Sequence, residues 1–221
     1  MISLKHKTNA AIFLGLVSTI VLGCSNASFP SEIEEDPNLL YHDDFSSDRT
    51  GPWHIEGDEL GSTAIDGEQL TIEVRSPNTI QYATLQEPVF SDFQLEIDAT
   101  LVEGAPNSTF GILFRMQESG EFYRFELMND GHYMIEKYDG EDDWTRLVDD
   151  WTFSDSISSG NIPNRLKIVA EGSNLSFYVN GELLREVTDT ALTNGYIGLD
   201  AGTFGTNLTV ASFDNLVLSN P

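Results

Sequence analysis

Two carboxylates, Glu96 and Asp98, alternate with apolar residues in the stretch Phe93–Leu101. A period of two predicts a β-strand on which both acids project from one face. A retaining glycosidase needs two carboxyl groups about 5 Å apart, one as the nucleophile and one as the acid and base. The stretch therefore carries residue types that could cleave a glycosidic bond, if a sheet positions them and completes the set.

Charged residues of both signs occupy the polar positions of the stretches that follow. Because alternation places each of them opposite its own apolar set, we expect Arg115, Arg124 and Glu126 to share one face of neighbouring strands with Glu96 and Asp98. Acids and bases would then form a ladder in which no carboxylate needs a raised pKa, and such pairing favours binding or structure over hydrolysis.

A polar groove that binds sugar hydroxyls beside an aromatic platform is the sharper interpretation of the same residues. Tyr133, Tyr138 and Trp144 are the nearest aromatic candidates, and each could instead pack in the core or at an edge. The hypothetical ligand-binding residues are Glu96, Asp98, Arg115, Arg124, Glu126, Lys137, Tyr133 and Trp144.

Short alternating stretches between turn signals make up nearly all of the chain from Tyr41 onward. Gln69–Val74, Arg165–Ala170 and Leu175–Val179 alternate like Phe93–Leu101, and no stretch has a sustained helical period. The pair Asn180–Gly181 predicts a tight hairpin turn. The pattern predicts an all-β fold, a two-sheet antiparallel jelly-roll β-sandwich over residues 38–220. The side chains expected to point inward are Phe93, Leu95, Ile97, Tyr123, Phe125, Leu175, Phe177 and Val179.

Hard oxygen ligands stand near both ends of this domain. In a jelly roll the first and last strands often pair, which would bring together Asp43, Asp44, Asp214 and Asn215. Carboxylate and amide oxygens suit a structural calcium ion, although these residues could also be solvated turn and edge groups. The histidines are dispersed, and no spacing typical of zinc occurs.

The N-terminus has the organisation of an export signal. Basic residues Lys5 and Lys7 precede an apolar run from about Ala10 to Leu22, which is short for a membrane span. The following VLGC resembles the bacterial lipobox, so we expect residues 1–23 to be a signal peptide and Cys24 to carry lipid. The alternative is an ordinary signal peptide with an incidental Cys. Residues 24–37 read as an acidic tether, and the expected location is the bacterial cell envelope, with membrane contact through the lipid only.

The charge balance of the chain excludes one class of partner. The formal net charge is -25, with 36 acids against 11 Lys and Arg. Such a field repels nucleic-acid phosphate and is compatible with neutral sugars or cations. Partner proteins and the oligomeric state are not indicated by any motif.

Several longer stretches together resemble a known family. They include YHDDFSSDRTGPW at the start of the domain, a hairpin with YVNG and a terminal strand with FDN. Their order is similar to the concanavalin A-like (laminin-G/glucanase) jelly rolls of bacterial surface proteins, closest to those related to the 3-keto-disaccharide hydrolase domain. The resemblance implies a glycan-active enzyme or a binding module without catalysis.

The glucanases of this group carry their catalytic acids on one strand as Glu-x-Asp-x-Glu, or with one extra residue before the last Glu. Glu96 and Asp98 match the first two positions, whereas the third falls on Thr100 or Leu101, which cannot carry the proton. Glu103 lies beyond that point and faces the other side of the strand. The missing third acid weighs against hydrolysis and leaves the question of enzymatic activity open.

Three functions remain after these observations. The preferred one is a lipid-anchored cell-surface β-sandwich that binds carbohydrate or another extracellular ligand without catalysis. The alternatives are a glycoside hydrolase related to the 3-keto-disaccharide hydrolases and a structural or adhesive envelope protein.

Overall fold

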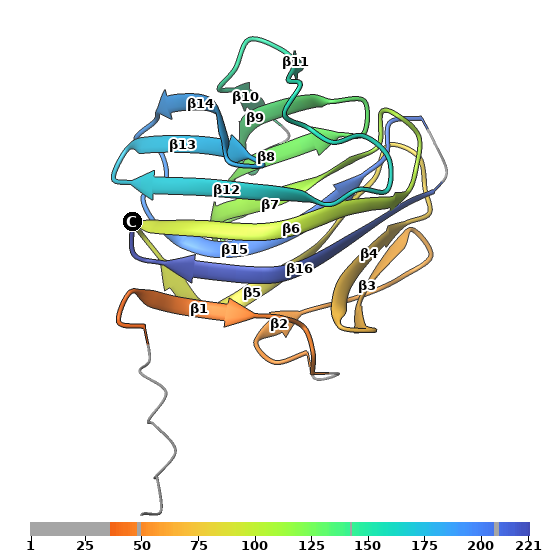
Figure 1. Cartoon of the computed structure of the whole chain (residues 1–221), viewed down its shortest axis with the longest axis horizontal. Coiled ribbons are helices and arrows are strands. Elements are labelled where there is room, and N and C mark those ends of the chain that lie inside the picture. Colours follow the sequence, from red (N-terminus) through yellow and green to blue (C-terminus); the bar gives the residue numbers. More distant parts are fainter. Residues whose placement is uncertain (1–35, 48–49, 142, 206–207) are drawn as a thin grey trace, which may run out of the picture. The chain divides into compact units, whose positions relative to one another are not determined.

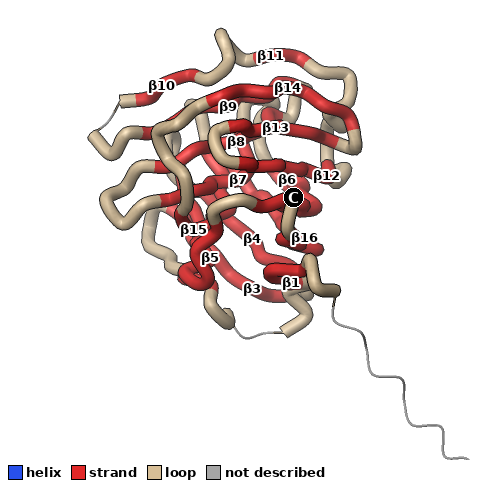
Figure 2. The backbone as a smooth tube through the Cα atoms, turned by 90° about the vertical axis from the view of Figure 1, so that its left-hand side faces the viewer, coloured by secondary structure: helices blue, strands red, loops and turns tan. Residues whose placement is uncertain are grey.

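The computed structural model describes residues 36–47, 50–141, 143–205 and 208–221, and within them the chain is built from strands, turns and loops. The predicted signal peptide, Cys24 and most of the tether lie outside the described residues. Figure 2 shows the strands in red and no helix among the residues it describes. Accordingly, the described part of the chain has no helix long and apolar enough to cross a membrane.

Two antiparallel sheets form the domain, and Figure 1 shows their strands overlapping as two layers. Sheet A has the order β14-β13-β12-β6-β16-β4-β3, and β1 also pairs with β16. Its strands are β1 (Leu39–Asp43), β3 (Gly61–Asp66), β4 (Gln69–Val74), β6 (Phe93–Glu103), β12 (Asn164–Glu171), β13 (Asn174–Val179), β14 (Glu182–Thr188) and β16 (Thr209–Ser219).

Sheet B has the order β10-β9-β8-β7-β15-β5-β2, and β11 also pairs with β9. Its strands are β2 (Trp53–His54), β5 (Ile80–Phe90), β7 (Thr109–Met116), β8 (Phe122–Met128), β9 (His132–Tyr138), β10 (Trp144–Arg146), β11 (Thr152–Phe153) and β15 (Gly195–Gly202). Among the described strands, the chain passes from one sheet to the other eight times, at β1/β2, β2/β3, β4/β5, β5/β6, β6/β7, β11/β12, β14/β15 and β15/β16.

The core lies between the sheets and consists of the inward-facing residue of each alternating pair. In β6 the alternating residues Phe93, Leu95, Ile97 and Ala99 are fully buried, whereas Glu96 and Asp98 between them remain about one-third exposed. Removal of apolar surface from water on this scale is the main stabilising contribution to a sandwich without disulfides. The predicted inward set is confirmed, because each of its members has no exposed surface: Phe93, Leu95, Ile97, Tyr123, Phe125, Leu175, Phe177 and Val179.

The hairpin between β13 and β14 forms at the predicted turn. Asn180 and Gly181 both have positive φ angles, of 52° and 88°. Two consecutive residues of this kind make the turn whose twist matches that of the strands it joins. The Asn180 side chain adds a restraint, since its Oδ1 accepts a hydrogen bond from Arg165 N at 2.8 Å.

Candidate functional site

The outer face of sheet A carries Glu96 and Asp98, the two acids that the sequence offers as candidates for catalysis or binding. Strand register places Asp98 opposite Arg165 and Glu96 opposite Lys167, both on β12. The Arg165 guanidinium donates to Glu96 Oε2 at 3.3 Å and to Asp98 Oδ1 at 3.2 Å, and Lys167 Nζ lies 3.8 Å from Glu96 Oε1. Asn215 Nδ2 donates to the other Asp98 oxygen at 2.9 Å. The acids therefore form a charge ladder, as expected, but with different basic partners.

The prediction that Arg115, Arg124 and Glu126 share the face of Glu96 and Asp98 is wrong. β6 belongs to sheet A, whereas β7 and β8 belong to sheet B. A sandwich has two outer faces, and the crossover between β6 and β7 puts the polar positions of these strands on opposite sides of the molecule.

A buried ionic cluster occupies the outer face of sheet B instead. Arg124 on β8 donates through Nε and Nη2 to Asp200 Oδ2 on β15, at 2.8 and 2.6 Å. Its Nη2 also lies 2.6 Å from Glu126 Oε2, and its Nη1 lies 3.5 Å from Glu136 Oε1 on β9. Arg124, Glu126 and Asp200 are at most 2% exposed. We refer to these four residues as the Arg124 cluster.

Glycines make room for the guanidinium of Arg124 as it crosses the sheet. Register places Gly111 on β7 between Glu126 and Asp200, so no side chain separates the two acids there. A Cβ at Gly202 on β15 would lie 2.7 Å from Thr109 Oγ1 and 3.4 Å from Arg124 Nη2. The small residues therefore permit the contact between β8 and β15 across β7.

Three acids surround one base in this cluster, and the pKa values reflect the imbalance. Burial raises the pKa of Glu126 to about 8, although Arg124 opposes the shift. Burial likewise raises the pKa values of Glu136 and Asp200 above their ordinary range. The expectation that no carboxylate in the predicted set has a raised pKa is therefore wrong for Glu126, because the group is buried and shares one guanidinium with two other acids.

Arg115 is also fully buried, but its guanidinium donates hydrogen bonds to backbone oxygens. Its Nη1 donates to Leu192 O at 2.8 Å and its Nη2 to Ser91 O at 3.0 Å, while Asp92 Oδ1 lies 3.7 Å away. Burial lowers the pKa of the guanidinium. Arg115 therefore ties the loop before β15 to the turn between β5 and β6.

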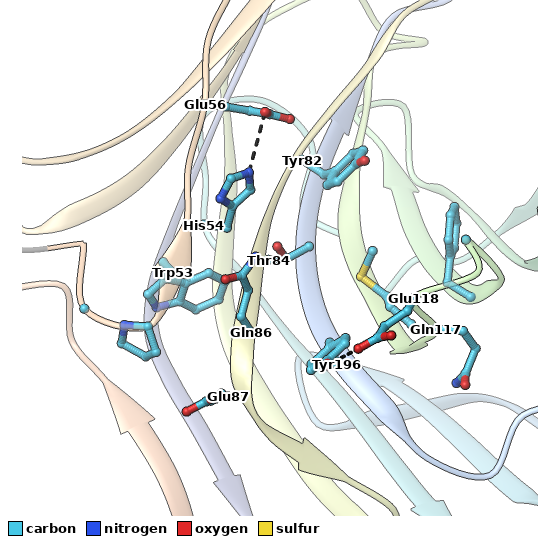
Figure 3. Close-up of a pocket in the computed structure, with 15 residues that line it drawn as sticks. Trp53, His54, Glu56, Tyr82, Thr84, Gln86, Glu87, Gln117, Glu118 and Tyr196 are labelled. Carbon is cyan, nitrogen blue, oxygen red and sulfur yellow. Dashed lines mark hydrogen bonds and ion pairs between the residues drawn. The ribbon is translucent and has the colours of Figure 1, made fainter.

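A groove opens on the outer face of sheet B (Figure 3). Its volume is about 800 Å³, within the range of small-molecule sites. Strand register sets Tyr82 on β5 opposite Asp200, and Phe122 stands two residues before Arg124 on β8, so groove and cluster share one face. The residues that line it are Gly51, Pro52, Trp53, His54, Glu56, Tyr82, Thr84, Gln86, Glu87, Met116, Gln117, Glu118, Gly120, Phe122 and Tyr196.

Aromatic and hydrogen-bonding side chains alternate around this groove. Tyr82 is 42% exposed, a large value for an aromatic residue within a strand. Tyr196 OH donates to Glu118 Oε1 at 3.4 Å, and His54 Nε2 lies 3.6 Å from Glu56 Oε2 (Figure 3). Gln117 Nε2 donates to the backbone oxygens of Arg115 and Asn194, which fixes the amide at the rim. The arrangement provides a ring face beside donors and acceptors, as sugar recognition requires.

The predicted aromatic candidates divide between core and surface. Tyr133 is 4% exposed and its hydroxyl donates to Leu184 O at 3.3 Å, so its use as a platform is excluded by burial. Trp144 packs on Tyr138 with ring centroids 4.8 Å apart and on Phe122 at 5.8 Å. This aromatic group continues the outer face of sheet B beyond the groove.

Lys137 does not point toward the groove. Register pairs it with Tyr123, whose side chain faces the core. Burial tends to raise the pKa of Asp189, but the hydrogen bonds from Tyr123 and from Ala191 N, and then the charge of Lys137, lower it overall. Lys137 therefore lies off the outer face of sheet B that carries the groove.

The predicted calcium ligands lie near one another, but their carboxylates do not converge on one point. β1 pairs with β16, as expected, and sets Asp43 opposite Leu216. Asp43 accepts hydrogen bonds from Tyr41 OH, Trp53 Nε1 and Phe45 N, at 2.9 to 3.0 Å. Among the described residues, no group of three or more His, Cys, Asp or Glu could hold a metal ion. Asp44 and Asp214 bond to the backbone amides of Ser46 and Asn215.

The groove residues themselves were not singled out by the sequence. A signal was present in the stretch Ile80–Gln86, where Tyr82, Thr84 and Gln86 alternate with buried Ala83 and Leu85. A large aromatic at a solvent-facing strand position is a usable sign of a binding surface.

The two packed antiparallel sheets, with a groove on one outer face, define a concanavalin A-like jelly roll. The chain matches the model of the 3-keto-alpha-glucoside-1,2-lyase-like domain over residues 43–218 and belongs to that family. No curated protein is significantly similar to it in sequence.

Solved structures with the same fold include binding modules and hydrolases. The carbohydrate-binding module CBM66 from Bacillus subtilis is 20% identical, with a TM-score of 0.59 over 76% of this chain and 96% of that one. The laminarinase catalytic domain from Thermotoga maritima is 11% identical, with a TM-score of 0.62 over 85% and 99% of the two chains. The Bacillus licheniformis beta-glucanase is 10% identical, with a TM-score of 0.61 over 82% and 98%. At these identities the likeness establishes the fold alone.

Proposed function

We propose that the sheet B groove binds a carbohydrate and does not cleave it. The observation that carries this proposal is the exposed ring of Tyr82 in a cavity of about 800 Å³. A sugar ring can pack its apolar face on such a side chain while its hydroxyls bond to neighbouring groups. Gln86 and Thr84, on the same face of β5, supply those groups from a rigid strand.

The position of the acids supports binding over hydrolysis. A general acid that works near neutral pH needs a raised pKa and must reach the glycosidic oxygen. Glu126 has the raised pKa, but it is 1% exposed and held against Arg124. Glu96 and Asp98 lie on the other sheet and are neutralised by Arg165 and Lys167.

An enzyme acting on a 3-keto-α-glucoside is the second candidate. It is favoured by the family and by the pair of His54 and Glu56, which lie 3.6 Å apart in the groove. A carboxylate that orients a histidine is a common arrangement for a general base.

Binding is tested by a glycan array and titration calorimetry with the chain lacking residues 1–24. Tyr82→Ala removes the ring, and we expect affinity for the identified glycan to fall at least tenfold, about the 1.4 kcal/mol of one stacking contact. Tyr178→Ala is the matched control, since Tyr178 projects from β13 in sheet A and packs on Lys167. Equal loss in both variants would contradict a site in the groove.

Turnover separates the two candidate functions. The proposal expects no product from 3-keto-α-glucosides in the presence of excess protein. Release of product that His54→Gln abolishes, and that Tyr178→Ala leaves unchanged, would establish the enzyme instead.

Attachment to the bacterial cell envelope through a lipidated Cys24 is part of the same proposal. Its support is the basic start, the apolar run and VLGC at the N-terminus. Mass spectrometry of the mature protein is expected to find a lipid-modified Cys24 as the first residue, and an unmodified Cys24 would contradict the anchor.

A further inference from the structure

Most of the ionisable side chains that line the groove are acidic. Glu56, Glu87 and Glu118 line it, whereas His54 is the only basic residue among the lining residues that the structure describes. All three glutamates are exposed to solvent. They come from three segments, one after β2, one within β5 and one in the turn after β7, so they surround the groove (Figure 3).

Neutralisation of these acids within the protein is weak. Glu56 meets His54 at 3.6 Å with 58% of its side chain exposed, and Glu118 accepts only a long hydrogen bond from Tyr196 at 3.4 Å. The exposed charge pair on the outer face of sheet A, by contrast, has two close cations. The carboxylates of the groove are therefore available to a cation from outside.

The described surroundings of the groove supply no excess of positive charge. The guanidinium of the Arg124 cluster on the same outer face is matched by the acids that contact it. A groove in a protein of net charge -25 concentrates cations and repels anions. The ring of Tyr82 can also attract an ammonium group, because the face of an aromatic ring carries negative charge.

We propose that the groove selects glycans that carry protonated amines, such as oligosaccharides of glucosamine, and excludes glycans that carry carboxylates or sulfates. This selectivity rests on the proposed function of the same groove. The amine would take the place of solvent beside the glutamates, while the sugar ring packs on Tyr82.

The test compares three hexasaccharides by calorimetry at about pH 5.5 and low salt, with the chain lacking residues 1–24. Glucosamine hexamer is expected to bind roughly tenfold more tightly than its N-acetylated counterpart, because each exposed ion pair contributes a factor of about 2 to 5. Oligogalacturonate is expected to show no binding. The preference for the amine should decrease as salt screens the charges.

A pair of variants separates the groove from the overall charge. Glu118→Gln is expected to lower the ratio of the two affinities, glucosamine hexamer over N-acetylated hexamer, about threefold. Glu182→Gln changes the net charge equally from the exposed start of β14 in sheet A, and should leave both affinities unchanged. An equal effect of the two variants would assign the preference to the overall field and overturn the proposal.

The failures of the two proposals are distinguishable. If a neutral glycan binds in a manner that depends on Tyr82 while amine and N-acetylated oligomers bind alike, the amine selectivity is wrong and carbohydrate binding stands. If no glycan binds to the protein or if oligogalacturonate binds most tightly, the selectivity is wrong, and in the former case the proposed function is wrong too.

Discussion

Arg124→Met tests whether the Arg124 cluster is held together by a single buried charge. The variant keeps an apolar stem of similar length and removes the guanidinium that contacts Asp200 and Glu126 at 2.6 Å. Breaking a buried ion pair by removing one partner costs about 3–5 kcal/mol, because the other charge is left without compensation.

The protonation states of the two acids give a closer value for the free-energy cost of Arg124→Met. Glu126, with a pKa of about 8, already holds a proton at pH 7, so the main burden falls on Asp200. An Asp of ordinary pKa 3.8 that must be protonated at pH 7 costs about 4 kcal/mol, at 1.36 kcal/mol per pH unit. At pH 5 the same step costs about 2 kcal/mol, so the penalty of the variant should be roughly halved.

Urea unfolding measures both values. With a slope of about 2.5 kcal/mol per M, the midpoint should fall by about 1.5 M at pH 7 and by less than 1 M at pH 5. Arg165→Met is the matched control, since Arg165 also contacts two carboxylates but is 31% exposed, and its loss should cost about 1 kcal/mol or less.

A second substitution tests whether the lost stability comes from Asp200. Asp200→Asn in the Arg124→Met background removes the acid that must be protonated and should restore much of the lost stability at pH 7. Equal penalties for Arg124→Met and Arg165→Met, or a penalty that is independent of pH, would refute the reasoning.

Two further predictions concern the same buried charges. Burial raises the folded-state pKa of Glu126 to about 8 from an ordinary 4.5, so its contribution to stability is complete below pH 4.5 and is lost as pH rises to 8. The urea midpoints at pH 5 and pH 8 should therefore differ less in Glu126→Gln than in the parent protein. An unchanged difference would contradict the raised pKa. Arg115→Met removes two hydrogen bonds to the carbonyls of Leu192 and Ser91 and should lower the free energy of unfolding by about 2–3 kcal/mol, measured in the same way; a loss below about 0.5 kcal/mol would show that the loop is held by other contacts.

Alternation predicted which side of each strand faces the core, because the period of a strand is fixed by its backbone. Phe93, Leu95 and Ile97 are buried as expected, and the Asn180–Gly181 turn forms because its residues tolerate positive φ. These features depend on interactions local to a strand or a turn.

The assignment of a strand to one sheet or the other depends on contacts between distant residues, and alternation does not specify it. Glu96 and Glu126 are both opposite their own apolar sets, yet they lie on the two outer faces of the sandwich. Exposure of the outer face was also not predictable, since Glu126 is buried by its neighbours while Glu96 is about one-third exposed. The groove went unrecognised for the same reason, because β2, β5, β7 and β15 meet only in the assembled sheet.

The Arg124 cluster also restricts how this family member can change during evolution. Arg124, Glu126 and Asp200 stand on two strands separated by β7, and loss of either Arg124 or Asp200 leaves the other with an uncompensated charge in a buried position. An ancestor could exchange the set for apolar residues only through substitutions that occur close together in time. We therefore expect positions 124, 126 and 200 to covary among descendants, whereas the exposed partners of Arg165 drift independently.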